Sequence, residues 1–165
     1  MPLVDALLPE FDHEMTTTRK VLERVPEDRL DWKPHSKSYA LGELATHLAN
    51  LPTWGSETLL KSDFDITSRP SLAAFPSTRE LLAAFDRNVT ATRSALNGKT
   101  DPELLAIWSL KRGGKTLFSM PKATVLRSFV LSHMIHHRAQ LGVYLRLLDI
   151  PVPSIYGPSA DEPSF

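Results

Sequence analysis

The chain has 165 residues, 42% of them hydrophobic and 23% charged, which suits a single domain over residues 1–165 with a sizeable core. Lysine plus arginine equals aspartate plus glutamate at 19 each, so the basic surface of a nucleic-acid-binding protein is missing. The chain contains no cysteine, which excludes disulfides, iron–sulfur clusters, thiolate zinc sites and cysteine nucleophiles.

The first residues and the hydropathy of the chain predict its surroundings. The first twelve residues carry Asp5, Glu10 and Asp12 and no basic cluster, unlike a signal peptide. No uninterrupted apolar run approaches the roughly 20 residues of a membrane span, so we expect a cytoplasmic protein without a membrane partner. A net charge of zero offers no electrostatic resistance to self-association, and we expect a homodimer.

Two helices are predicted in the first third of the chain. The first covers residues 3–25, with Pro9 starting its main segment or kinking it and Pro26 ending it. After a loop, Ser38 is expected to cap a second helix, whose leucines recur at helical spacing. Pro52 is expected to bend this helix rather than stop it, because apolar residues continue the amphipathic pattern beyond the proline.

The middle of the chain predicts a crossover and a third helix. Residues 61–77 show no strong periodicity and are too long for a simple antiparallel connection, so we expect them to cross the length of a helical bundle. Ser77 or Thr78 is expected to cap a helix that ends near Leu96, followed by Asn97-Gly98 as a stop signal. Apolar residues spaced three and four apart give this helix a core-facing side.

The last third of the chain predicts one more long helix. Residues 101–106 are expected to form a short helical turn, and residues 107–120, with Gly113-Gly114 between polar residues, a small hairpin or an irregular excursion. The last long helix is expected over residues 121–149, followed by an extended, proline-rich tail over residues 150–165. Together the four long helices predict an all-α fold, a four-helix bundle.

The most informative residues are two histidines in this last helix. His133 and His137 are four residues apart, about one helical turn, so both imidazoles leave the same side of the helix. They are in register with an apolar seam made by Leu126, Val130, Leu141, Tyr144 and Leu148. Burying an imidazole without a partner costs about 1–3 kcal/mol, which bonds to a metal ion would offset. The pair therefore favours a metal site.

The other four histidines differ in their positions. His47 lies at the border of the buried arc of the second helix and is either a hydrogen-bonded core histidine or a ligand facing a pocket between helices. His136 is rotated about 60° from His133 and leaves the seam, which favours a surface or supporting role. His13, among acidic neighbours, and His35, in a proline-flanked loop, are expected to be structural or solvated.

Three polar residues lie close to these histidines in the sequence. Glu43, one turn before His47, either orients an imidazole or is a solvated carboxylate near a helix start, where the helix dipole favours it. Gln140 is expected to make a hydrogen bond inside the bundle. Arg138 is suited to an anion contact or to a salt bridge in a dimer, and the sequence does not decide between the two.

Residues 132–141 read Ser-His-Met-Ile-His-His-Arg-Ala-Gln-Leu and follow the pattern H-x-x-x-H-R-x-Q. This pattern resembles the last-helix motif of the DinB-like family, which comprises damage-inducible and related metal-binding four-helix bundles. Residues 41–49, Leu-Gly-Glu-Leu-Ala-Thr-His-Leu-Ala, resemble its second-helix motif, and residues 30–34 and 156–162 also look like the family. The resemblance spans nearly the whole chain and implies an up-down-down-up bundle with a long crossover between helices 2 and 3.

The resemblance also implies a three-histidine metal site, carried onto His47, His133 and His137, all of which match. Related proteins include metal-dependent transferases that act with low-molecular-weight thiols, an isomerase, and many members without an assigned reaction. We therefore expect an open site for a divalent ion, zinc or nickel, in an enzyme of the thiol-transferase type. A small-molecule substrate is expected to enter near Trp54, and a thiol would have to be a cosubstrate because the chain has no cysteine.

Two other functions stay open at this point. The ion could staple the helices or sense metal without catalysis, or the histidines could simply pack in an interaction module. A structural metal site normally has four protein ligands, and only three are identified, which favours an open site. No catalytic residue outside the ligands is identified, and the H-E-x-x-H and G-x-S-x-G motifs are missing.

Overall fold

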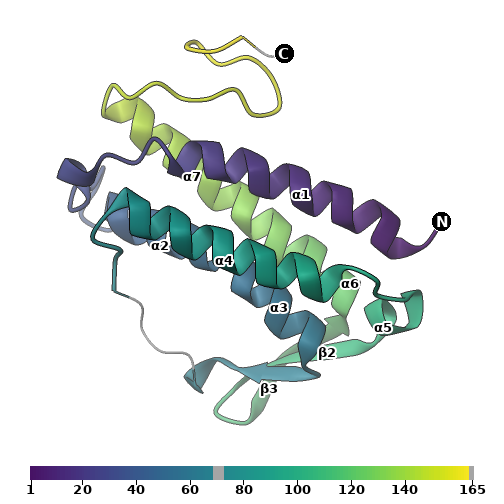
Figure 1. The fold of residues 1–165 in the computed structure, drawn as a ribbon. Coiled ribbons are helices and arrows are strands. Elements are labelled where there is room, and N and C mark those ends of the chain that lie inside the picture. The colour runs from purple at the N-terminus through teal and green to yellow at the C-terminus, as the bar shows by residue number, and fades with distance from the viewer. Residues whose placement is uncertain (69–72, 164–165) are drawn as a thin grey trace.

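Long helical segments run side by side in the structure, a computed structural model that describes residues 1–68 and 73–163 (Figure 1). They are α1 (Leu3–Leu22), α2 (Leu41–Asn50) with its continuation α3 (Pro52–Leu60), α4 (Thr78–Leu96) and α7 (Ser132–Leu147). Both α1 and α2 pack against α4 and against α7. Figure 1 shows α1 and α7 running in one direction and α2, α3 and α4 in the other.

The core lies between these helices because each one carries an apolar stripe at helical spacing. Leu22, Leu41, Leu48, Met134 and Leu141 are fully buried there and come from α1, α2 and α7. Burial of one such side chain stabilises the fold by about 1.5–3 kcal/mol. Two of these residues, Met134 directly after His133 and Leu141 one turn after His137, anchor this part of α7 in the core and so fix the position of the histidine pair.

A three-stranded sheet accompanies the helices, so the prediction of an all-α fold is wrong. The strands are β1 (Asp63–Asp65), β2 (Ile107–Arg112) and β3 (Lys115–Pro121), in the order β1-β2-β3. β1 pairs in parallel with β2, and β2 pairs antiparallel with β3. Figure 1 shows the sheet next to the end of α3, beneath the long helices. The described part of the chain is therefore a mixed fold of helices and sheet.

Local features of the chain explain the sheet. Trp108 and Leu110 are buried and alternate with more exposed residues along β2, the period of a half-buried strand. Gly113 and Gly114 have φ angles of 57° and 77°, the left-handed conformation that a two-residue hairpin turn requires. The carboxylate of Asp65, at the end of β1, accepts hydrogen bonds from the N–H groups of both glycines at 3.0 and 2.7 Å. Because β1 has only three residues, it leaves no periodic signal in the sequence.

The start of α2 differs from its prediction. It begins after Ala40 rather than after Ser38, because the Glu43 carboxylate accepts a hydrogen bond from the Ala40 N–H at 2.7 Å and closes the first turn there. At its other end, Leu51 keeps helical dihedral angles, φ −59° and ψ −37°, and Pro52 opens α3. The helical path thus continues through the proline, as predicted.

The remaining helices follow their predictions in part. α1 ends at Leu22, three residues earlier than predicted. The prediction for α4 is confirmed, because the Ser77 hydroxyl accepts a hydrogen bond from the Glu80 N–H at 3.2 Å.

The predicted last helix is divided into α6 (Lys122–Thr124), the π-helix η3 (Val125–Leu131) and α7. π-helical segments are rare and often occur at functional sites. The short elements are α5 (Asp101–Leu105) and the 3-10 turns η1 (Glu27–Arg29) and η2 (Ile66–Ser68).

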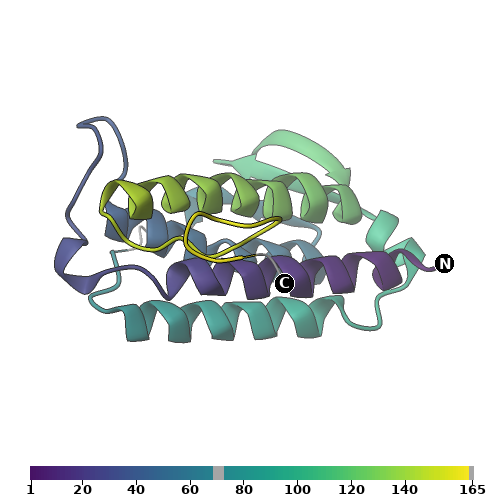
Figure 2. The same ribbon diagram turned by 90° about the horizontal axis from the view of Figure 1, so that it is seen from above.

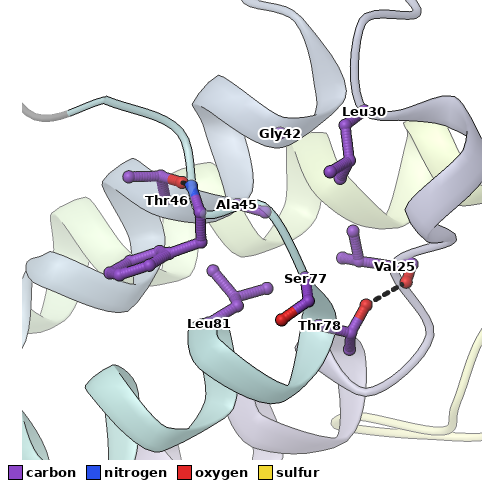
Figure 3. Close-up of a pocket in the computed structure, with 9 residues that line it drawn as sticks. Val25, Leu30, Gly42, Ala45, Thr46, Ser77, Thr78 and Leu81 are labelled. Carbon is purple, nitrogen blue, oxygen red and sulfur yellow. Dashed lines mark hydrogen bonds between the residues drawn. The ribbon is translucent and has the colours of Figure 1, made fainter.

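Two loops pack against α2, the helix that carries His47, as Figure 3 shows. The N–H of Gly42 donates to the carbonyl of Leu30 at 2.8 Å, and a Cβ atom on Gly42 would lie only 3.2 Å from that oxygen. Glycine allows this close approach. On the next turn of α2, Thr46 Oγ1 accepts a hydrogen bond from the N–H of Phe75 at 3.0 Å. These contacts hold the first turns of α2 in place and so help to position His47.

Parts of two predicted segments lie outside the described residues. The predicted crossover over residues 61–77 includes residues 69–72, of which nothing is described, while its other parts form β1 and η2. The predicted extended tail includes residues 164–165, which are likewise outside. The tail's described residues lie across α1 and α7 (Figures 1 and 2). No helix among the described residues is long and apolar enough to cross a membrane.

Candidate metal centre

The side chains of three histidines meet between α2 and α7. His47 comes from α2, and His133 and His137 come from consecutive turns of α7. The Nε2 atom of His133 lies 3.4 Å from Nε2 of His47 and 2.8 Å from Nε2 of His137. The potential ligand nitrogens of the three rings all lie within 4.8 Å of one another. The structure thus brings together the three histidines that the sequence singles out.

The separation between His47 and His133 fits two ligands of one ion. Two nitrogens bound to zinc at about 2.0–2.1 Å in tetrahedral geometry stand roughly 3.3 Å apart, close to the 3.4 Å between His47 and His133. At 2.8 Å, the Nε2 atoms of His133 and His137 cannot both turn bare lone pairs toward each other, so a proton or a cation must lie between them. One cation shared by the three rings would satisfy all of these nitrogens.

Contacts on the outer side of two rings determine which nitrogen is free to bind. The Nδ1 atom of His137 lies 2.7 Å from Oε1 of Gln140. Because this oxygen only accepts, Nδ1 carries the proton and Nε2 of the neutral ring is bare. The His133 ring in turn donates a hydrogen bond to the backbone carbonyl of Phe129, one turn before it, which acts to raise the pKa of the ring. Gln140 therefore orients His137, in the way that supporting residues orient metal-binding histidines.

The surroundings of the cluster favour neutral imidazoles. His137 is 8% exposed, and His47 and His133 are half-buried. Burial lowers the pKa of His133 below its usual 6.5, and the neighbouring His137 and His136 lower it further. Burial likewise lowers the pKa of His137, against an opposing effect of the hydrogen bond to Gln140. Because metals bind the neutral ring, His133 and His137 are in the binding form at neutral pH.

The other histidines lie outside this cluster. The exposed His136 contacts the edge of His137, with ring centroids 4.9 Å apart, and its side chain leaves the seam. His13 is also exposed and stacks on Tyr156 at 6.4 Å. The Nδ1 atom of His35 accepts a hydrogen bond from the backbone N–H two residues later at 3.1 Å. His136, His13 and His35 therefore lie outside the ligand set, as predicted from the sequence.

Glu43 does not orient an imidazole. Its carboxylate accepts a hydrogen bond from the N–H of Ala40 and lies 3.7 Å from the Nζ atom of Lys33. Of the two interpretations of Glu43, the exposed carboxylate at a helix start is the one that the structure supports.

Arg138 belongs to a different, buried polar cluster. Its side chain is 1% exposed, and Nη1 lies 2.7 Å from the carboxylate of Glu14 on α1. Nη2 donates to the hydroxyl of Tyr156 at 2.6 Å, and that hydroxyl donates to Glu14 at 2.8 Å. An anion contact or a dimer salt bridge is therefore the wrong interpretation of Arg138. Glu14 was not among the predicted residues, although it lies three residues after the buried Phe11 and so faces the core side of α1.

Comparisons with known proteins place the chain in a family. The sequence model of the DinB family matches residues 2–164. The uncharacterized protein YrdA of Bacillus subtilis (strain 168) is 25% identical over 162 residues, which is 96% of this chain and 91% of YrdA.

Two crystal structures of DinB-like proteins are similar to this structure. The protein from Bacillus cereus ATCC 10987 is 25% identical, with a TM-score of 0.72 over 92% of this chain and 97% of that chain. YjoA from Bacillus subtilis shares the fold at 16% identity, with a TM-score of 0.72 over 91% of this chain and 96% of YjoA. Because the family match covers nearly the whole chain, the chain belongs to the DinB family.

Proposed function

We propose that this protein binds one divalent metal ion through His47, His133 and His137 and acts as a metal-dependent enzyme of the thiol-transferase type. The observation that carries the proposal is the convergence of the three rings, with Nε2 atoms 3.4 and 2.8 Å apart. The hydrogen bond between His137 and Gln140 supports it, because it leaves the inward nitrogen of that ring bare.

The donor set limits the choice of metal. Three imidazole nitrogens suit zinc or nickel better than calcium or magnesium, which prefer oxygen ligands. The chain contributes no thiolate, because it has no cysteine. A divalent ion at such a site would lower the pKa of a bound thiol or water and so supply a nucleophile at neutral pH. His47, His133 and His137 would hold the ion, and Gln140 would fix the ring of His137.

The partial exposure of the cluster favours catalysis over a purely structural role. His47 and His133 are half-buried, so a small molecule can approach the nitrogens from solvent. Within residues 1–68 and 73–163, the cluster contains three ligand residues, whereas a structural zinc site normally has four. The thiol would enter as a low-molecular-weight cosubstrate, together with an electrophilic small molecule.

A non-catalytic metal-binding protein is the alternative. One observation favours it: the three histidines come from both α2 and α7. An ion bound to them would cross-link the two helices and stabilise the fold. A cytoplasmic location and a homodimer stay predictions, and analytical ultracentrifugation would test the homodimer.

Metal analysis of the purified protein tests the proposal. We expect about one divalent ion per chain, and we expect His137→Ala to weaken metal binding by more than about 100-fold, beyond the usual effect of losing a supporting residue. His136→Ala is the matched control, because it removes the neighbouring exposed imidazole outside the cluster. Unchanged metal affinity in His137→Ala, or no stoichiometric ion in the wild type, would overturn the proposal.

A turnover assay separates the two functions. The metal-loaded protein is incubated with a panel of small thiols and electrophilic acceptors, with the His137→Ala variant beside it. Thioether formation that is lost in the variant supports the enzyme, whereas stoichiometric metal without turnover across the panel favours the alternative.

A further inference from the structure

Aromatic rings contact the histidine cluster from two sides. The ring of Tyr39, directly before α2, is stacked on His47 with centroids 6.1 Å apart and meets His137 edge-on at 6.5 Å. The ring of Phe129, in the π-helix η3, is tilted against His133 at 5.8 Å. Each of the three histidines therefore has Tyr39 or Phe129 as an aromatic neighbour.

The contact with Phe129 continues into the sheet. Phe129 packs against Trp54 of α3 at 5.2 Å and against Phe118 of β3 at 5.6 Å. Trp54 in turn packs against Phe64 of β1 at 5.4 Å. We call Phe64, Phe118, Trp54 and Phe129 the aromatic wall. It is rigidly supported, because Trp54 is 8% exposed and the two outer phenylalanines belong to paired strands.

Tyr39 is placed differently from the wall. It is 51% exposed, although its ring lies against His137, which is 8% exposed. Its backbone is held, since its carbonyl accepts a hydrogen bond from the hydroxyl of Tyr144 at 3.2 Å. Tyr39 thus stands at the solvent edge of the cluster with its main chain anchored. An exposed aromatic residue beside convergent polar groups is typical of a small-molecule site.

We propose that this site takes ligands whose metal-binding atom is attached to a flat aromatic or conjugated ring, and that Tyr39 and Phe129 determine this specificity. The inference rests on the proposed metal site. The residues of the aromatic wall and Tyr39 carry no charge, so they cannot pair with a negatively charged ligand. Their ring faces and edges can instead pack against a planar ligand. Aromatic pairs contribute about 0.5–1.5 kcal/mol beyond the apolar area that they bury.

Cobalt-loaded protein allows a direct binding test, because a ligand that reaches Co²⁺ changes its visible spectrum. The probes are imidazole, 4-phenylimidazole and 4-cyclohexylimidazole, which carry the same metal-binding nitrogen. We expect 4-phenylimidazole to bind about tenfold more tightly than imidazole. The affinity of 4-cyclohexylimidazole is expected to lie between those of imidazole and 4-phenylimidazole.

Two variants assign this preference to the rings. Tyr39→Ser and Phe129→Leu are each expected to bring the affinities of the phenyl and cyclohexyl probes close together, while the affinity for imidazole itself changes less than about twofold. Phe129 contacts Trp54 and Phe118, so its variant is used only if it binds one Co²⁺ per chain. Because Tyr39 is exposed, we expect Tyr39→Ser to fold like the wild type. Leu147→Ala, 58% exposed near the end of α7, is the control that leaves all affinities unchanged.

The outcomes separate this inference from the proposed function. If Co²⁺ does not bind, both fail. If Co²⁺ and imidazole bind but the phenyl probe gains nothing over the cyclohexyl probe, the aromatic specificity is overturned and the metal site stands. A phenyl preference that persists in both variants likewise overturns the roles of Tyr39 and Phe129.

Discussion

His137 and Arg138 are neighbours on α7, yet they belong to two polar clusters of opposite character. His137 meets His47 and His133, three groups of the same chemistry whose nitrogens converge. Arg138 meets Glu14, a group of opposite charge, at 2.7 Å. One cluster gathers potential metal ligands, whereas the other pairs opposite charges within the chain.

This difference separates a candidate functional site from a structural one. The guanidinium of Arg138 also donates to the hydroxyls of Thr18 and Tyr156, at 3.3 and 2.6 Å, so its charge is balanced and its donors are used. Tyr156 brings the carboxyl-terminal tail onto this pair, and burial and the hydrogen bond to Glu14 raise the pKa of its hydroxyl. The histidine cluster instead brings three potential ligand nitrogens together at a position where two of the rings are half-buried, which favours a ligand.

The largest expected effect belongs to the ion pair. Glu14→Ala leaves the buried guanidinium of Arg138 unpaired, and we expect a loss of about 3–5 kcal/mol in the free energy of unfolding, since Glu14 is 7% exposed. Urea denaturation measures it. We expect the variant to keep its metal stoichiometry under native conditions.

The double variant Glu14→Leu with Arg138→Met is the control for this prediction. Removing both charges is often neutral or stabilising, so it should recover most of the lost stability. If the double variant is as unstable as Glu14→Ala, the cluster is more than a self-contained ion pair and the contrast with the histidines is weaker.

A smaller effect is expected from the residue that orients His137. Gln140→Leu removes the acceptor of the Nδ1 proton, and loss of such a partner typically weakens metal binding about 10–100-fold. Competition with a chromophoric chelator measures the affinity. Gln140→Glu keeps an acceptor oxygen and should bind at least as tightly as the wild type. Equal affinities in all three proteins would show that the histidine cluster does not depend on this hydrogen bond.

Much of the histidine cluster could be predicted from the sequence because helical spacing is a local property. The four-residue step between His133 and His137 places both rings on one face of α7 without any knowledge of the rest of the fold. His47 is 86 residues from His133, and periodicity placed it only at a helix border. The resemblance to the family supplied that pairing.

The remaining features have no local signal. Tyr156 and Glu14 are 142 residues apart, and no spacing rule connects a tail residue to the middle of α1. The hairpin of β2 and β3 was one of the two structures predicted for residues 107–120, but the three residues of β1 are too few to show a period, so the third strand of the sheet was missed. The π-helix η3 was also missed, because its apolar residues resemble those of an ordinary helix and only the hydrogen bonds differ.

The smallest expected effect is the pH dependence of stability in the metal-free protein. Unfolded imidazoles have a pKa of about 6.5, and burial lowers the pKa of His133 and His137 below that value in the folded protein. As the pH falls below 6.5, the unfolded chain therefore takes up protons before the folded one does, and stability declines until the lowered pKa values are passed. Above pH 6.5 this contribution is constant.

Urea midpoints between about pH 5 and about pH 8 measure this slope. The double variant His133→Asn with His137→Asn should show a shallower decline on acidification, because two of the groups that discriminate between the folded and unfolded states are gone. The other cluster supplies the contrast, because the pKa of Tyr156 is raised from a value already near 10, well above this range. If the stability of the double variant declines as steeply as that of the wild type, the pH dependence comes from elsewhere in the protein and not from the burial of His133 and His137.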